Sequence, residues 1–191
     1  MVFSTAGKQN TADTIALAVS RAQALNAPLI VSTYTGETGL TLVKAVKDAG
    51  ADLSIIAVRG TFGFHIPGAF KMPAETEQQL LDAGVEIVSA AHALSGAERS
   101  ISKKFGGAYP VEIIAHTLRM FGQGTKVAVE CAIMAYDAGL LEPGTPVVSL
   151  GGTGTGVDTA LVITPAGSAQ VLDVKIHEVL CLPFEKKAVK A

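Results

Sequence analysis

Short apolar runs alternate along the chain with longer stretches in which apolar residues recur at helical spacing. The short runs predict buried strands, and the stretches between them predict helices. Predicted strands cover residues 29–33, 53–58, 85–88 and 146–150, and predicted helices cover residues 11–25, 40–49, 73–84, 110–121 and 125–138. Strand-helix-strand passages of this length join parallel strands by right-handed crossovers, so the pattern predicts an α/β domain.

The end of the chain predicts a hairpin. Residues 158–164 and 169–177 flank a turn, and Leu172, Val174 and Ile176 alternate with polar residues in the second segment. The expected fold is therefore a three-layer α/β/α domain with a mixed, mostly parallel central sheet. We expect residues 1–184 to form this single domain and residues 185–191 to form a disordered tail.

The loop after the first predicted strand is the strongest candidate for ligand binding. Backbone N–H groups at a helix start have no intrahelical partner and carry partial positive charge, so this loop is a natural place for an anion. Its hydroxyl groups add donors and its glycines allow close approach; the candidate residues are Thr33, Tyr34, Thr35, Gly36, Glu37, Thr38 and Gly39. The alternative is that Thr38 only caps the following helix. We call residues 33–39 the cradle.

Three further loops follow predicted strands and would meet the cradle at one edge of the sheet. One of them, residues 89–96, offers no candidate contact, and the other two do. One spans residues 59–72, and its candidate contacts are Gly63, Phe64 and His65. The other is rich in glycine, and its candidate contacts are Gly152, Thr153, Gly154, Thr155, Gly156 and Asp158. Phe64 is expected either to pack on a ligand ring or to fill the core. The glycine loop is expected either to touch a ligand or to be a flexible turn. Asp158 is expected either to anchor backbone N–H groups or to bind ligand hydroxyls.

The segment Thr33-Tyr34-Thr35-Gly36-Glu37-Thr38 resembles the phosphate-binding loop in the C-terminal α/β domain of pyruvate kinase. The whole chain resembles free-standing relatives of that domain, through Gly7, Asn10 and Thr11, through Gly63-Phe64 with Pro67-Gly68, and through residues 152–159. The resemblance implies a flavin mononucleotide (FMN) ligand. Glu37 stands where the kinases often carry a basic residue, which argues against a sugar bisphosphate.

Composition narrows the function further. The 191 residues carry 15 Lys and Arg against 17 Asp and Glu, and no long basic run precedes the last lysines, so no nucleic acid partner is expected. No stretch approaches about 18 continuous apolar residues and the first residues lack the order of a signal peptide, so we expect a cytoplasmic protein without membrane contact. The chain leaves no room for a kinase barrel of about 250 residues, so no kinase activity is expected.

Catalytic signals are weak. Cys131 and Cys181 have neither metal nor redox spacing and are expected to be buried. Ser95 and Glu98 have the spacing of a capping box, so Glu98 is expected to bond the Ser95 backbone and not to act as an acid. No nucleophile with its base and no metal site is identifiable, and His65 is the only histidine in a candidate loop.

The sequence therefore predicts binding of a phosphorylated small molecule, and the resemblance implies that FMN is this molecule and the cofactor. Two alternatives remain open: a flavin-dependent oxidoreductase, and a regulatory sensor of a phosphorylated metabolite without catalysis. A homo-oligomer is compatible with each of the three.

Overall fold

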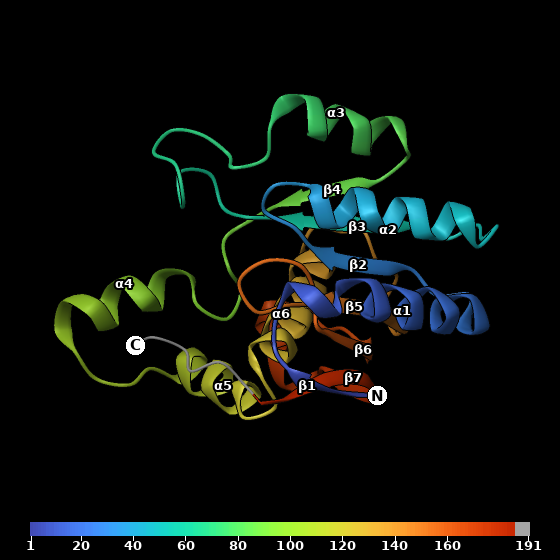
Figure 1. The fold of residues 1–191 in the computed structure, drawn as a ribbon. Coiled ribbons are helices and arrows are strands. Elements are labelled where there is room, and N and C mark those ends of the chain that lie inside the picture. Colours follow the sequence, from blue (N-terminus) through green and yellow to red (C-terminus); the bar gives the residue numbers. More distant parts are fainter. Residues whose placement is uncertain (186–191) are drawn as a thin grey trace.

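The computed structural model describes residues 1–185 and contains one seven-stranded sheet in the order β1-β7-β6-β5-β2-β3-β4 (Figure 1). The strands are β1 (Val2–Thr5), β2 (Leu29–Ser32), β3 (Ile55–Arg59), β4 (Glu86–Ser89), β5 (Val147–Gly151), β6 (Thr159–Thr164) and β7 (Lys175–Glu185). Every neighbouring pair is parallel except β5 with β6 and β6 with β7, so only β6 runs against the others. The predicted mixed, mostly parallel sheet is confirmed.

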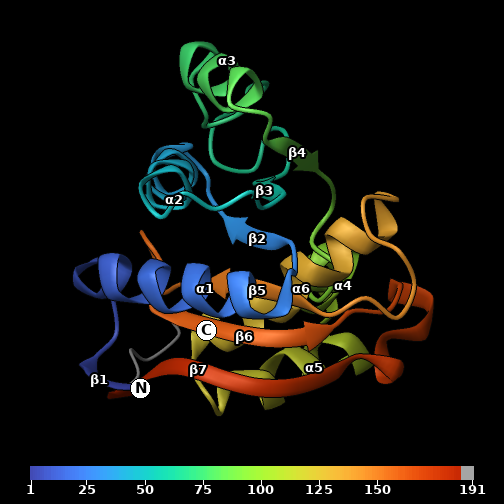
Figure 2. The same cartoon turned by 90° about the vertical axis from the view of Figure 1, so that its right-hand side faces the viewer.

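Helices cover both faces of this sheet (Figure 2). They are α1 (Thr11–Leu25), α2 (Glu37–Asp48), α3 (Ala74–Asp82), α4 (Gly96–Phe105), α5 (Pro110–Arg119) and α6 (Gln123–Asp137), with short 3-10 helices η1 (Lys8–Asn10) and η2 (Ser168–Asp173). One apolar core joins α1, α2 and α3 to the sheet, and a second joins α5 and α6 to its other face. The domain is thus a three-layer α/β/α sandwich.

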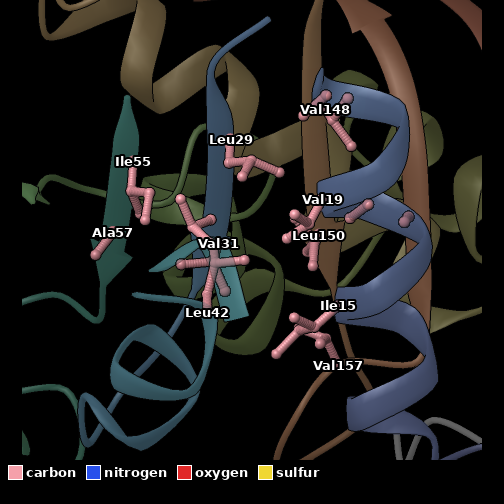
Figure 3. Close-up of a cluster of buried hydrophobic side chains, with 14 of the residues drawn as sticks. Ile15, Val19, Leu29, Val31, Leu42, Ile55, Ala57, Val148, Leu150 and Val157 are labelled. Atoms are coloured by element: carbon pink, nitrogen blue, oxygen red, sulfur yellow. The ribbon is translucent and has the colours of Figure 1, made fainter. Parts of the chain in front are cut away.

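Strand β2 lies inside the sheet, between β5 and β3, and belongs to both cores. Leu29, Ile30 and Val31 are each 0% exposed. Successive side chains of a strand point to opposite faces, so Leu29 and Val31 join the first core, which Figure 3 shows. Ile30 joins the second core. A run without polar alternation is what a strand buried on both faces requires.

The hairpin prediction is correct for β6 and wrong for the segment after it. Residues 168–173 form η2, whose start is fixed by Asp137, because its Oδ1 accepts a hydrogen bond from Ser168 N at 3.0 Å. Leu172 is 85% exposed, so the apolar alternation through this segment did not reflect burial. The true partner strand, β7, begins at Lys175 and extends to Glu185.

Two features near the ends of the chain, strand β1 and the position of Glu185, were not predicted. Strand β1 was not predicted, because its four residues carry only Val2 and Phe3 as apolar side chains. It pairs in parallel with β7, and Thr5 lies opposite Glu185, so Glu185 belongs to the sheet and not to a tail. The rest of the predicted tail, residues 186–191, lies outside the described residues.

The capping box prediction is wrong in its partner. Ser95 precedes α4, but its hydroxyl lies 3.4 Å from Glu130 Oε1. Glu98 instead accepts a hydrogen bond from the N–H of Glu112 at 3.1 Å, in the first turn of α5. Glu98 is therefore a capping residue as expected, but of the next helix.

The two cysteines are confirmed as buried free thiols, and Cys181 Sγ lies 3.7 Å from Thr14 Oγ1. Burial raises the pKa of the Cys131 thiol, with a further contribution from Glu130. Within residues 1–185, none of the helices has the length and apolar character that crossing a membrane would take.

Candidate functional site

The order of the strands reverses beside β2. From β2 the chain moves to β3 and β4 on one side, and it returns to β5 on the other side. Val31 of β2 lies opposite Leu150 of β5, so the loops that follow these strands leave the sheet side by side. In open α/β sheets ligands bind in the crevice outside the carboxyl ends of strands at such a reversal. The cradle and the glycine loop are these two loops.

Three helices begin at the same edge. Helix α1 begins at Thr11 and α2 at Glu37, each just after the carboxyl end of a strand, while α6 begins at Gln123 and leads back to the start of β5. The long loop after β3 projects from this edge as well, on the left of Figure 1. The positive ends of three helix dipoles therefore face the region between β2 and β5.

The cradle has a fixed backbone. Thr33 is 6% exposed, its N–H donates to Val58 O at 2.9 Å, and its Oγ1 accepts a hydrogen bond from Gly36 N at 3.0 Å. Gly36 has φ 89°, and a Cβ there would lie 2.3 Å from Thr76 Cγ2, so only glycine fits. The loop is thus shaped before any ligand arrives.

Thr38 does not cap α2. The helix begins at Glu37, Gly36 occupies the N-cap position, and Thr38 lies inside the first turn. Leu40 is the first residue of this helix whose N–H reaches back into the loop, donating to Gly36 O at 2.9 Å. The earlier N–H groups have no intrahelical acceptor. The hydroxyls of Thr35 and Thr38 also make no hydrogen bond with any residue in the described part of the chain.

Lys8 is a site residue that the sequence did not reveal. Its Nζ lies 3.7 Å from Glu37 Oε2, and both side chains are largely exposed. A Cβ at Gly156 would lie 3.2 Å from Lys8 Cα, so the same residue borders the glycine loop. Lys8 thus brings a positive charge to the cradle from a distant segment of the chain, and it offsets the charge of Glu37.

Asp158 anchors backbone. It is 0% exposed, Gly7 N donates to its Oδ2 at 3.0 Å, and Thr159 Oγ1 donates to its Oδ1 at 3.0 Å. The neighbouring Val157 N donates to Thr11 Oγ1 at 3.1 Å. These bonds support the anchoring role for Asp158, and contact with ligand hydroxyls stays a prediction.

The glycine loop is tied down where it rejoins the sheet. A Cβ at Gly152 would lie 2.0 Å from Gly156 O, and one at Gly156 would lie 2.2 Å from Thr11 Oγ1. The glycines therefore serve close packing of backbone against backbone. The interpretation as a flexible turn does not fit these contacts, and ligand contact stays a prediction for the loop.

Aromatic side chains of the long loop gather beside the cradle. The ring centroids of Tyr34 and His65 are 4.5 Å apart, those of Phe64 and His65 are 4.9 Å apart, and those of Phe64 and His92 are 5.5 Å apart. Phe64 is 46% exposed, so the alternative that it fills the core is wrong. We call Tyr34, Phe64, His65 and His92 the aromatic cluster. Gly63 supports it only indirectly, through its own φ of 76°.

A buried charged group adjoins this cluster. The side chains of Lys126 and Glu130 are 3% and 4% exposed and form an ion pair one turn apart on α6. Glu130 Oε2 also lies 3.3 Å from His92 Nδ1, and Glu130 Oε1 accepts a hydrogen bond from Leu94 N at 2.9 Å. Burial works to raise the pKa of Glu130, but the bond from His92 and the charge of Lys126 outweigh it and lower the pKa to about 2.

Tyr34 connects the cradle to this charged group. Burial raises the pKa of the Tyr34 hydroxyl, the charge of Glu130 raises it further, and Arg99 opposes both. Its ring lies on Gly60, where a Cβ would be 2.3 Å from Tyr34 Cε1. The hydroxyl therefore stays neutral at physiological pH and can donate a hydrogen bond within the site.

Sequence reasoning missed Lys126, Glu130 and His92. A Lys and a Glu four residues apart are usual on the solvent face of a helix, and His92 lies in a loop that carries no motif. One signal was available: the helix that holds the pair is otherwise apolar over most of its length, from Ala128 to Ala135. A charged pair on a helix with so little polar surface is a sign of burial.

The family model for the pyruvate kinase alpha/beta domain matches residues 12–163 of this chain. This range includes the cradle, the loop of the aromatic cluster, the buried pair of α6 and the glycine loop. The chain therefore belongs to the pyruvate kinase alpha/beta domain family, and the resemblance seen in the sequence is confirmed.

Proposed function

We propose that this member of the pyruvate kinase alpha/beta domain family binds a phosphorylated small molecule, and that FMN is this ligand. The observation that carries the proposal is the cradle itself. Its backbone is fixed by Thr33 and Gly36 at the N-terminus of α2, where the strand order reverses. A rigid, glycine-containing loop at a helix N-terminus favours phosphate, because N–H groups point outward and the dipole attracts negative charge.

The cradle fits a phosphate group in three respects. The first N–H groups of α2 have no intrahelical acceptor, and the hydroxyls of Thr35 and Thr38 bond no described residue. Lys8 offsets the negative charge of Glu37 at its mouth. We infer that Thr35, Thr38 and Lys8 contact the phosphate.

The aromatic cluster fits a flavin ring. A mononucleotide needs an apolar or aromatic wall within reach of its phosphate. Tyr34 belongs both to the cradle and to the cluster, and the edge of its ring meets His65 at 4.5 Å between centroids. We infer that Tyr34, Phe64 and His65 border the ring, and that FMN, when bound, supplies the redox chemistry of its isoalloxazine.

An oxidoreductase activity is the second candidate, and His92 is the observation that favours it. His92 Nδ1 faces Glu130, and its Nε2 is buried without a hydrogen-bond partner among the described residues. An imidazole held by a carboxylate can take up or give a proton at its other nitrogen. A flavin-dependent enzyme predicts that a reductant bleaches the bound flavin, and that His92→Gln slows this reaction while FMN still binds.

For the cellular setting we propose a cytoplasmic protein that acts on a small molecule, without nucleic acid, and that forms a homo-oligomer. We expect no phosphoryl transfer from phosphoenolpyruvate to ADP, since the described residues form an α/β/α sandwich and not a kinase barrel. A coupled assay for pyruvate tests this.

The proposed ligand is tested by titrating the purified protein with FMN and with riboflavin, following the flavin fluorescence. Each charge-assisted hydrogen bond to the phosphate contributes about 1.5 to 3 kcal/mol, so FMN should bind at least about tenfold more tightly. Equal affinities would remove the cradle from the binding site, and no affinity for either compound would remove FMN.

A further inference from the structure

The start of α6 carries polar groups whose hydrogen-bonding capacity the protein does not use. Thr125 is 2% exposed, and its Oγ1 has no partner among the described residues. The same holds for Oγ1 of Thr153 in the glycine loop. Leaving a buried hydroxyl without a partner is unfavourable, so such groups in a native structure point to something that they bind.

Thr125 is directed toward the open end of its helix. It is the third residue of α6, and side chains of a helix lean toward its N-terminus. Helix α6 has 15 residues, and the N–H groups of its first turn have no intrahelical acceptor. A Cβ at Gly151 would lie 2.1 Å from Gly124 O, so this first turn is packed against the end of β5.

Two arginines stand beside this helix start without carboxylate partners. Arg119 Nε donates to Gln123 Oε1 at 2.8 Å, which holds its guanidinium along the first turn of α6. Neither Arg119 nor Arg99 forms an ion pair with any residue from 1 to 185. Burial lowers the pKa of Arg119, Glu130 opposes this, and the like charge of Arg99 lowers it further.

Of the two carboxylates that act on Arg119, one is paired with another cation and the other accepts a hydrogen bond from a neutral hydroxyl. Glu130 is paired with Lys126, and Glu112, which also acts on Arg119, accepts a hydrogen bond from Ser102 Oγ at 2.7 Å. Arg119 beside a helix N-terminus, with Arg99 near it and neither of them in an ion pair within residues 1–185, favours the binding of an anion. The planar fork of arginine matches the oxygens of carboxylate and phosphate groups.

We propose that the first turn of α6, with Thr125, Arg119 and Arg99, is a second oxyanion site, separate from the cradle at α2. It takes the carboxylate or phosphate group of a small acidic molecule. Arg99 lies 5.7 Å from the Phe64 ring centroid, and its charge opposes the rise in the pKa of Tyr34. The site therefore adjoins the aromatic cluster. An acidic substrate held there would lie next to whatever ring the cluster binds. The site does not depend on the identity of the ligand in the cradle.

The test is a titration of the isotope-labelled protein with inorganic phosphate at constant ionic strength, followed by the amide NMR signals of both helix starts. The amides of Gln123, Gly124 and Thr125 report the second site, and those of Glu37 and Thr38 report the cradle. We expect the α6 signals to move and saturate. Arg119→Gln should weaken their response about tenfold and leave the α2 response unchanged, since it removes charge-assisted bonds only at α6.

Three variants complete the experiment. Lys44→Gln removes the same charge from the exposed pair with Asp48 and should change neither response. Thr125→Val keeps the shape of the side chain and removes its hydroxyl, so it should weaken the α6 response even if Arg119→Gln fails to fold. Thr38→Asp should abolish the α2 response alone. An α6 response that is absent, or that Arg119→Gln and Thr125→Val leave unchanged, overturns the second site. A missing α2 response instead overturns the cradle.

Discussion

Helices α2 and α6 begin at the same edge of the sheet, but the polar groups at the start of α2 are exposed and those at the start of α6 are buried. The first turn of α2 follows a loop of hydroxyl groups and glycine, and the Glu37 side chain there is 73% exposed. The first turns of α6 hold a lysine and a glutamate whose side chains are 3% and 4% exposed. The exposed region can change its ligand contacts without harm to the fold. The buried region is part of the fold, so its chemistry and its stability cannot be separated.

Removing the buried carboxylate should have the largest effect on stability. Glu130→Gln leaves the Lys126 ammonium buried without a counter-charge, so the free energy of unfolding should fall by about 3 to 5 kcal/mol. Urea denaturation measures this. The matched control is Asp48→Asn, which breaks the exposed pair with Lys44 and should cost less than about 1 kcal/mol. Similar losses in the two variants would show that the buried pair is no more important than a surface pair.

The second largest effect is expected in the pH dependence of stability, which should depend on Glu130 in the buried region. The pKa of Glu130 is lowered from 4.5 to about 2 in the folded protein. A carboxylate with a lowered pKa adds stability that is fully present above its unfolded pKa and is lost as pH falls toward the folded pKa. Between about pH 4.5 and pH 2 the wild type should therefore lose on the order of 3 kcal/mol more than Glu130→Gln. Parallel stability curves for the two proteins would contradict the assignment.

A smaller effect is expected from the shape of the cradle. Gly36→Ala places a Cβ 2.3 Å from Thr76 Cγ2 at φ 89°, whereas Gly84→Ala has nothing within 4 Å at φ 78°. Both substitutions carry the cost of a positive φ, roughly 1 kcal/mol, and Gly36→Ala adds a steric clash of about 1 to 3 kcal/mol. Thermal unfolding compares them. Only Gly36→Ala should also weaken FMN binding, and equal behaviour of both variants would mean that the cradle is not held in a special shape.

Much of the fold could be predicted from the sequence because the buried strands of the sheet are continuous apolar segments. Leu29, Ile30 and Val31 are buried on both faces, and a continuous apolar run is the direct record of that position. Edge positions leave no such record. Strand β1 has four residues and only one of them, Phe3, is buried, so its pattern resembles a loop. Leu172 shows the reverse error, an apolar side chain in an alternating pattern that is fully outside the core.

The candidate site also has a part that could be predicted from the sequence and a part that could not. The cradle could be found because one contiguous segment, Thr33 to Gly39, supplies its backbone and its hydroxyls. Lys8, His92 and Glu130 come from separate segments, and only the packing of η1, α6 and the loop after β4 brings them to the cradle and the aromatic cluster. Asp158 was expected either to anchor backbone or to bind a ligand, and only the packing shows that it bonds Gly7 and Thr159.

The most direct test of the account is the ratio of riboflavin to FMN dissociation constants in Thr38→Asp, compared with the wild type and with Thr41→Asp. Thr38 lies in the first turn of α2, and Thr41 lies one turn further on, where its hydroxyl donates to Glu37 O. An aspartate at position 38 places a carboxylate beside the phosphate, so the preference for FMN should fall from at least about tenfold to near one, with the melting temperature unchanged. Thr41→Asp should keep most of the preference. An unchanged preference in Thr38→Asp would contradict the claim that a ligand phosphate sits at the start of α2.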